Sequence, residues 1–134
     1  MLLGVDTGFF ISVVNQRPRS IELWNEFVEG KHSLVISTVT VNELFVYFYR
    51  IGLPSTAQEW LERMQQTKHA EFIPISIQIA KNSATYRHSL GMATIDSLIL
   101  ATFIEYQCEK VLTVDNAFRL AAIQNIIPVE VLTS

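Results

Sequence analysis

Five short apolar runs limit most strongly what this chain can fold into. Each spans four residues and lies between turn residues or helical patterns. Continuous apolar runs of this length are typical of strands that are buried on both faces of a sheet. The predicted strands cover residues 2–5, 34–37, 72–75, 111–114 and 129–132. Pro74 lies within the third run and predicts an edge position for that strand.

Amphipathic stretches with helical spacing separate these runs. The expected helices cover residues 9–14, 21–29, 41–50, 57–69, 76 to about 88, a stretch beginning near 94, and 117–123. The expected N-caps are Ser20, either Ser55 or Thr56, and Thr94. Strands that alternate with helices predict an α/β fold, in which about five parallel strands carry helices on both faces.

Composition narrows the class of protein. A length of 134 residues with 49% hydrophobic content suits one domain, residues 1–134, with a sizeable core. The sequence contains no run of about 18 uncharged apolar residues, so no membrane-spanning helix is expected. The first residues do not resemble a signal peptide. The single cysteine, Cys108, fits a reducing cytoplasm. A net charge of −3 argues against nucleic-acid binding through a broadly basic surface.

The acidic residues are distributed unevenly. The chain has ten glutamates, most of which lie on amphipathic helical stretches, and only three aspartates. Asp6 and Asp115 come directly after predicted strands, and Asp96 lies in the first turn of a predicted helix. Glu43 lies at the start of the helix that follows the second strand. The four acids therefore meet at the carboxyl edge of a parallel sheet, where open α/β folds bind ligands.

Each acid also has a purely structural interpretation. Asp6 can form an Asx-turn with Thr7 and Gly8. Glu43 stands three residues after Thr40, which is the spacing of a capping box. Asp96 gains from the helix dipole, and Asp115 can cap the helix that follows it.

Four carboxylates on one edge repel each other, and each is costly to desolvate. A divalent cation offsets both costs. Oxygen-only ligands favour Mg²⁺ or Mn²⁺ over zinc, and the three histidines show no spacing typical of zinc ligands.

In this order and spacing, the acids and their neighbours resemble the PIN-domain ribonucleases, most closely the single-domain VapC-type toxins of toxin–antitoxin pairs. The resemblance covers essentially the whole chain. The motifs that carry it are Asp6, Glu43 in Val-Asn-Glu-Leu, Asp96 in Asp-Ser-Leu-Ile-Leu-Ala-Thr, and Asp115 in Leu-Thr-Val-Asp-Asn-Ala-Phe.

The resemblance implies a three-layer α/β/α sandwich and Mg²⁺- or Mn²⁺-dependent cleavage of RNA that leaves a 5′-phosphate and a 3′-hydroxyl. It assigns metal binding and catalysis to the four acids. Thr113, Thr7 and Asn116 are the expected supporting residues. Many relatives carry a further acid where this chain has Ala117, so the number of metal ions, one or two, stays open.

Contacts to substrate and partners are less specific in the sequence. Arg17, Arg19 and Arg87 are candidates for binding RNA phosphates, with ordinary solvated charges as the alternative. The apolar run 44–49 predicts either a central core helix or a surface that contacts another chain. The resemblance implies a homodimer and an antitoxin partner.

Two other functions are compatible with parts of the sequence. One is a PIN-fold scaffold that binds RNA or protein without catalysis, but a scaffold has no need of four acids. The other is a phosphohydrolase that works through a phosphoryl-aspartate. That mechanism favours a second aspartate two residues after the first, where this chain has Gly8.

Overall fold

The computed structural model describes residues 1–132 and contains one sheet of five parallel strands. The strands are β1 (Leu2–Val5), β2 (Ser33–Ser37), β3 (Ala70–Ile73), β4 (Lys110–Thr113) and β5 (Val129–Val131). Their order across the sheet is β3-β2-β1-β4-β5, and every neighbouring pair is parallel. The predicted strand number and direction are confirmed. β3 lies at an edge as predicted, although Pro74 follows the strand and is not part of it.

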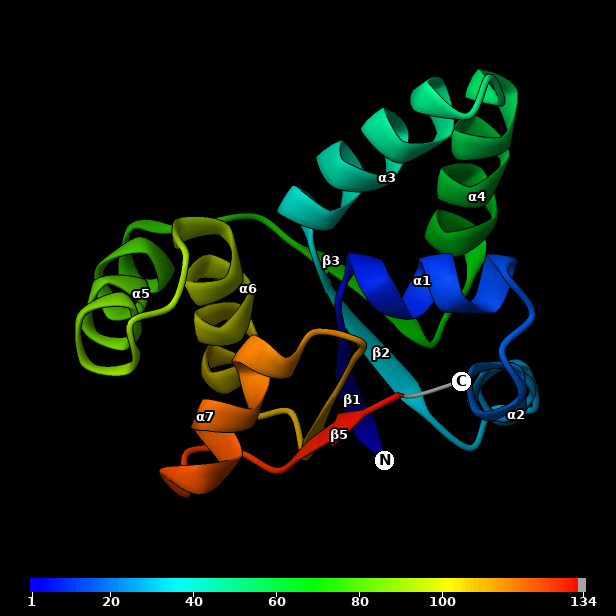
Figure 1. Cartoon of the computed structure of the whole chain (residues 1–134). Helices are drawn as coiled ribbons and strands as arrows, with labels where there is room; N and C mark the ends of the chain where they lie inside the picture. The colour runs from blue at the N-terminus through cyan, green and yellow to red at the C-terminus, as the bar shows by residue number, and fades with distance from the viewer. Residues whose placement is uncertain (133–134) are drawn as a thin grey trace.

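Helices connect the strands and cover both faces of the sheet (Figure 1). They are α1 (Thr7–Val14), α2 (Pro18–Val28), α3 (Thr38–Arg50), α4 (Pro54–Gln66), α5 (Ile77–Leu90), α6 (Thr94–Glu105), the 3₁₀ turn η1 (Asn116–Phe118) and α7 (Arg119–Ile123). The first four lie on one face, and α5, α6 and α7 lie on the other (Figure 1). The chain is therefore the three-layer α/β/α sandwich that the resemblance implied.

The strands supply alternate side chains to two separate cores, because successive residues of a strand point to opposite faces. The core beneath α1–α4 contains strand residues Leu3, Val5, Leu34, Ile36 and Leu112. The core beneath α5–α7 contains Val35, Ile73 and Val111. At Gly4 the ring of Phe103 lies so close to the backbone that an added Cβ would overlap it. Glycine at this position lets α6 approach the sheet.

Three predicted helix caps are wrong. Ser20 lies inside α2, where its buried hydroxyl accepts a hydrogen bond from Ser12. Neither Ser55 nor Thr56 caps α4, since Leu53 is its N-cap and Pro54 begins the helix. Thr94 is the first residue of α6, and Ala93 is the cap residue. In two of these cases a proline fits the first helical turn, so the helix begins before the polar residue that the sequence favoured.

The apolar run 44–49 is not buried all round. Leu44 and Phe48 belong to the core, whereas Val46 and Tyr49 are 37% and 58% exposed. Cys108 is a small buried residue as predicted, and burial raises the pKa of its thiol to about 12. Within residues 1–132, no helix is long and apolar enough to cross a membrane.

Candidate active site

Four carboxylates from four separate elements line one pocket of about 250 Å³. Asp6 follows β1 and caps α1, Glu43 lies on α3, Asp96 lies in the first turn of α6, and Asp115 follows β4. The other lining residues are Thr7, Gly8, Ile11, Ile99 and Val114.

The sheet register explains why Asp6 and Asp115 come together. β1 and β4 are neighbouring parallel strands, and Val5 pairs with Leu112. The next residues, Asp6 and Thr113, therefore lie side by side where both strands end. Their side chains are joined, because the Thr113 hydroxyl donates a hydrogen bond to Oδ2 of Asp6.

Asp6 is held rigidly in a buried position. It is only 5% exposed, and its Oδ1 accepts a hydrogen bond of 3.0 Å from the backbone N–H of Phe9. Burial raises the pKa of Asp6 to about 6, against the opposing effect of its two hydrogen bonds. The nearby Asp96 and Asp115 raise the pKa further. Asp6 is thus both a helix cap and a carboxylate that shares the pocket with other negative charge.

Thr113 links Asp6 to Asp115. Its hydroxyl donates to Asp6 and accepts a hydrogen bond of 2.9 Å from the backbone N–H of Asp115. Oδ1 of Asp115 in turn accepts from the backbone N–H of Ala117 at 2.8 Å, which caps η1. Asp115 is predicted from the sequence to cap the helix that ends at Ile123; it caps the 3₁₀ turn that leads into α7, whose own N-cap residue is Phe118, and it also lines the pocket.

Glu43 does not form the predicted capping box. α3 begins three residues earlier than expected and is capped by Ser37, whose hydroxyl accepts from the N–H of Val39 at 3.2 Å. The buried hydroxyl of Thr40 has no hydrogen-bond partner within residues 1–132. Glu43 instead accepts a hydrogen bond of 2.6 Å from the Thr7 hydroxyl on α1. That contact directs its carboxylate toward the pocket.

Asp96 faces the charge of the other acids. Burial raises its pKa to about 6, and the negative charges of Asp115 and Glu43 add to the effect. Asp96 is half-buried, and both influences disfavour its ionised form.

The pocket fits a divalent cation in donor type. Its four carboxylates are the oxygen donors that Mg²⁺ and Mn²⁺ prefer, and their mutual repulsion is what a cation relieves. Among residues 1–132, no three acidic, histidine or cysteine side chains are close enough together to hold a metal ion as they stand. The donor set is therefore present, and side-chain adjustment is needed to bring it around one ion.

The sequence model of the PIN domain family matches residues 4–124. The chain belongs to the PIN domain family. Proteins of this family are typically nucleases. None of the curated proteins is significantly similar to this chain in sequence.

Solved structures share the fold of this PIN domain along nearly its whole length. VapBC2 from Rickettsia felis, bound to a DNA fragment from its promoter, has a TM-score of 0.73 at 17% identity and covers 97% of this chain and 98% of its own. VapBC-1 from nontypeable Haemophilus influenzae has a TM-score of 0.70 at 15% identity and covers 97% of both chains. A toxin–antitoxin complex from Klebsiella pneumoniae has a TM-score of 0.66 at 22% identity and covers 87% of this chain and 89% of its own. At these identities the likeness shows a common fold.

The other residues predicted for the site of this PIN domain are scattered. Arg17 lines a hollow that adjoins the acid pocket. Arg19 forms ion pairs with Glu22 and Glu130 instead of facing the pocket. Arg87 is exposed in the last turn of α5 and lies outside the pocket lining.

Asn116 also turns away from the acids. Its side-chain oxygen accepts a hydrogen bond of 2.8 Å from Nε of Arg119, and it does not line the pocket. Of the three expected supporting residues, Thr113 and Thr7 contact acids and Asn116 does not.

Sequence reasoning missed two residues of α3 that lie beside the site. Tyr47 and Arg50 line a hollow together with Thr7 and Glu43. A usable signal was present, since positions four and seven residues after Glu43 lie on the same helical face. The apolar character of residues 44–49 instead favours a core helix or a protein contact, which hides this face of α3 in the sequence.

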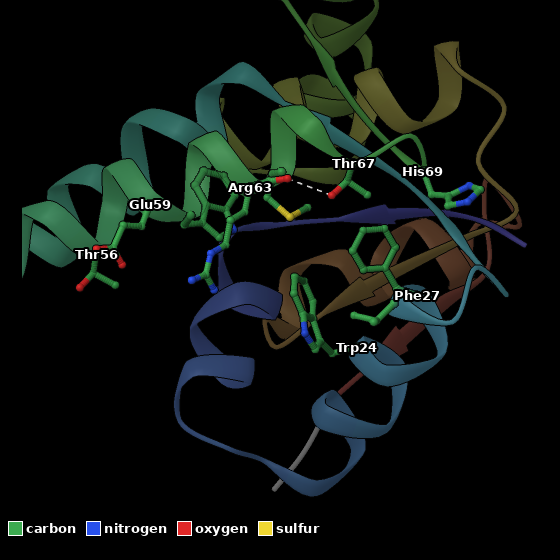
Figure 2. A pocket seen from close by; sticks show the side chains of 10 residues that line it. Trp24, Phe27, Thr56, Glu59, Arg63, Thr67 and His69 are labelled. Atoms are coloured by element: carbon green, nitrogen blue, oxygen red, sulfur yellow. Dashed lines mark hydrogen bonds between the residues drawn. The ribbon is translucent and has the colours of Figure 1, made fainter.

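A separate apolar pocket of about 340 Å³ lies between α2 and α4 (Figure 2). Trp24 and Phe27 of α2 face it from one side, and Arg63 and Thr67 lie on the other (Figure 2). None of the four acids lines this pocket, so it is distinct from the candidate active site.

Proposed function

We propose that this PIN domain is a Mg²⁺- or Mn²⁺-dependent endoribonuclease and the toxin of a toxin–antitoxin pair. The observation that carries the proposal is the convergence of Asp6, Glu43, Asp96 and Asp115, from four separate elements, on one pocket. Two further findings support it: proteins of the family are typically nucleases, and one structural relative is a toxin–antitoxin complex.

The four carboxylates would hold the cation. A divalent cation bound there supplies Lewis-acid chemistry, which lowers the pKa of water and offsets the charge of a phosphodiester. Thr113 holds Asp6 and the backbone of Asp115 in place, and Thr7 holds Glu43. These hydroxyls orient the acids before substrate binds.

The test is incubation of the purified protein with a mixed RNA pool, with Mn²⁺ or with EDTA, followed by mapping of the cut ends. We expect cleavage only with Mn²⁺, and 5′-phosphate and 3′-hydroxyl ends. Asp96→Asn should abolish cleavage, because it removes one negative oxygen from the donor set while the amide keeps the side-chain volume.

Glu105→Gln is the matched control, since Glu105 ends the same helix and does not line the pocket. It should cleave RNA as the wild type does. Mn²⁺ should also raise the melting temperature of the wild type and of Glu105→Gln but not that of Asp96→Asn. Full activity of well-folded Asp96→Asn would overturn the proposal, and RNA binding without cleavage by the wild type would favour a scaffold.

We also propose an antitoxin partner, a homodimer and a cytoplasmic location. The partner is supported by the relative from Klebsiella pneumoniae and by the exposed apolar pocket between α2 and α4.

The homodimer is supported by exposed apolar side chains around the α3–α4 turn, namely Tyr49, Ile51 and Leu53. Light scattering of the purified chain tests the dimer, and a monomer at all concentrations would overturn it. The free Cys108 supports the location.

A further inference from the structure

Two hollows adjoin the acid pocket and share lining residues with it. One, of about 240 Å³, contains Arg17 and shares Gly8, Ile11 and Val114 with the acid pocket. The other, of about 410 Å³, contains Arg50 and shares Thr7, Ile11 and Glu43 with it. The three adjoining hollows are together called the trough below, and the acid pocket shares three lining residues with each of the other two.

The Arg50 end of the trough is built on one face of α3. Glu43, Val46, Tyr47 and Arg50 are spaced as i, i+3, i+4 and i+7, which places them on one side of the helix. Arg50 is two turns beyond Glu43, about 10 Å along the axis. Arg50 therefore lies near the acids but does not line the acid pocket.

The two arginines are the cations that the trough offers to a ligand. Both are exposed, and within residues 1–132 neither forms an ion pair with a carboxylate. Arg19, by contrast, is neutralised by two glutamates. A ligand that lies along the trough therefore meets positive charge at each end and negative charge in the middle.

Tyr47 adds an aromatic surface between Glu43 and Arg50. Its ring packs edge-on against Phe48, with 5.3 Å between the ring centroids, and it is only partly buried. An aromatic ring beside an arginine in a groove is the combination that binds unpaired bases and the backbone of single-stranded nucleic acid.

We infer that a single RNA strand binds along the trough, with the phosphate to be cleaved at the acids and neighbouring phosphates at Arg17 and Arg50. Tyr47 stacks on a base that is free of pairing. The inference rests on the proposed nuclease function and assigns positioning roles to Arg50 and Tyr47. A single strand is required, since bases held in a duplex cannot turn toward Tyr47.

The first test is binding in EDTA, which separates positioning of the strand from cleavage. A fluorescein-labelled single-stranded RNA is titrated with wild type, Arg50→Gln and Arg63→Gln at several salt concentrations. Arg63 is the matched control, because it is an exposed, unpaired arginine of the described chain outside the trough. We expect Arg50→Gln to raise Kd about three- to tenfold and to lower the salt slope by about 0.7, as loss of one phosphate contact does. Arg63→Gln should match the wild type.

The second test uses cleavage with Mn²⁺ and a second substitution. Arg50→Gln should raise KM and leave kcat nearly unchanged, because Arg50 contacts a phosphate that does not react. Tyr47→Leu, which keeps an apolar side chain, should weaken binding of single-stranded RNA and have little effect on duplex RNA.

Each outcome separates this inference from the nuclease proposal. If the wild type binds single-stranded RNA without cleaving it and Arg50→Gln weakens that binding, the nuclease proposal fails and the binding path stands. If the wild type cleaves RNA and Arg50→Gln has the Kd and salt slope of Arg63→Gln, the path is wrong. Tighter binding of duplex than of single-stranded RNA, or no RNA binding by the wild type, would also overturn it.

Discussion

Asp6 contributes to both the helix and the pocket that meet at its position. Its carboxylate caps α1 through the N–H of Phe9, and it also lines the acid pocket. The cap stabilises the protein, whereas burial of a negative charge beside Asp96 and Asp115 destabilises it. The pKa of Asp6 is raised despite its two hydrogen bonds, which indicates that desolvation of the charge outweighs them.

We predict that Asp6→Asn stabilises the metal-free protein. The folded carboxyl has a pKa of about 6 against an ordinary value of 3.8, so the folded state retains a proton that the unfolded state has lost. Stability of the wild type therefore falls as pH rises from about 3.8 to about 6 and stays low above that pH. Asparagine removes this loss and its oxygen still accepts the capping hydrogen bond from Phe9, but its NH2 group cannot accept the Thr113 hydroxyl, which offsets part of the gain. The free energy of unfolding in EDTA at pH 7.5 should rise by roughly 1–3 kcal/mol.

The pH dependence distinguishes this effect from a change in packing. The difference between Asp6→Asn and wild type, measured by urea unfolding, should be constant from pH 7.5 to about pH 6 and then shrink as pH falls toward 3.8. A variant that is less stable than the wild type at pH 7.5 would contradict the prediction, because it would mean that the ionised carboxylate is net stabilising.

Helix starts show how one element depends on its neighbours in the chain. Ser76 caps α5, and its hydroxyl accepts a hydrogen bond of 3.1 Å from the N–H of Ile79. Ser55 has the same local appearance in the sequence but lies inside the first turn of α4 and forms no cap. Pro54 causes the difference, because its fixed φ and missing N–H favour the first helical position.

These two serines allow a matched test of capping. Ser76→Ala should lower the free energy of unfolding by about 1 kcal/mol, since it leaves the N–H of Ile79 without its partner. Ser55→Ala should change it by less than about 0.5 kcal/mol. Both are measured by urea unfolding at pH 7. Equal losses in the two variants would show that the hydroxyl of Ser55 also supports its helix.

At the scale of the whole molecule, Glu130 connects three elements. Its carboxylate on β5 accepts hydrogen bonds from Nε of Arg19 on α2 at 2.8 Å and from Nζ of Lys110 on β4 at 2.7 Å. Its side chain is only 24% exposed. These two cations lower the pKa of Glu130 to about 2, with the hydrogen bond from Arg19 as the main cause.

We predict that Glu130→Gln destabilises the protein at neutral pH and less so at pH 3. The folded pKa is about 2 and the ordinary value is 4.5, so the stabilising contribution is complete above pH 4.5 and is lost as pH falls toward 2. Because the group is partly solvated, we expect a loss of about 1 kcal/mol at pH 7. Urea unfolding at pH 7 and pH 3 measures the change.

Glu22→Gln is the control for the Glu130 prediction. Glu22 pairs with the same Arg19 at 2.9 Å, but its side chain is 62% exposed. Its replacement should have an effect near zero at both pH values. A Glu22→Gln loss as large as that of Glu130→Gln would show that burial of Glu130 does not matter.

Much of this arrangement could be read from local patterns. A four-residue apolar run followed by Asp6 predicts a strand end with a carboxylate, and the same pattern recurs at Asp115. The residue positions of the acids relative to strands and helices follow from such spacing. The predicted starts of α2 and α3, directly after Ser20 and Thr40, are too late. α2 begins at Pro18, and α3 is capped by Ser37, so in each case an earlier residue begins the helix.

The α/β class, the parallel sheet and the edge on which the acids gather follow from the amino-acid sequence, because strand and helix periodicity are local properties of the chain. The groups that hold each acid depend on the folded arrangement: Thr113 holds Asp6, and Thr7 holds Glu43. The same arrangement pairs Arg19 with Glu130 and places Arg17 and Arg50 in the two hollows beside the acid pocket. Such pairings join residues far apart in the chain, and their partners depend on strand order and helix packing, which local spacing does not encode.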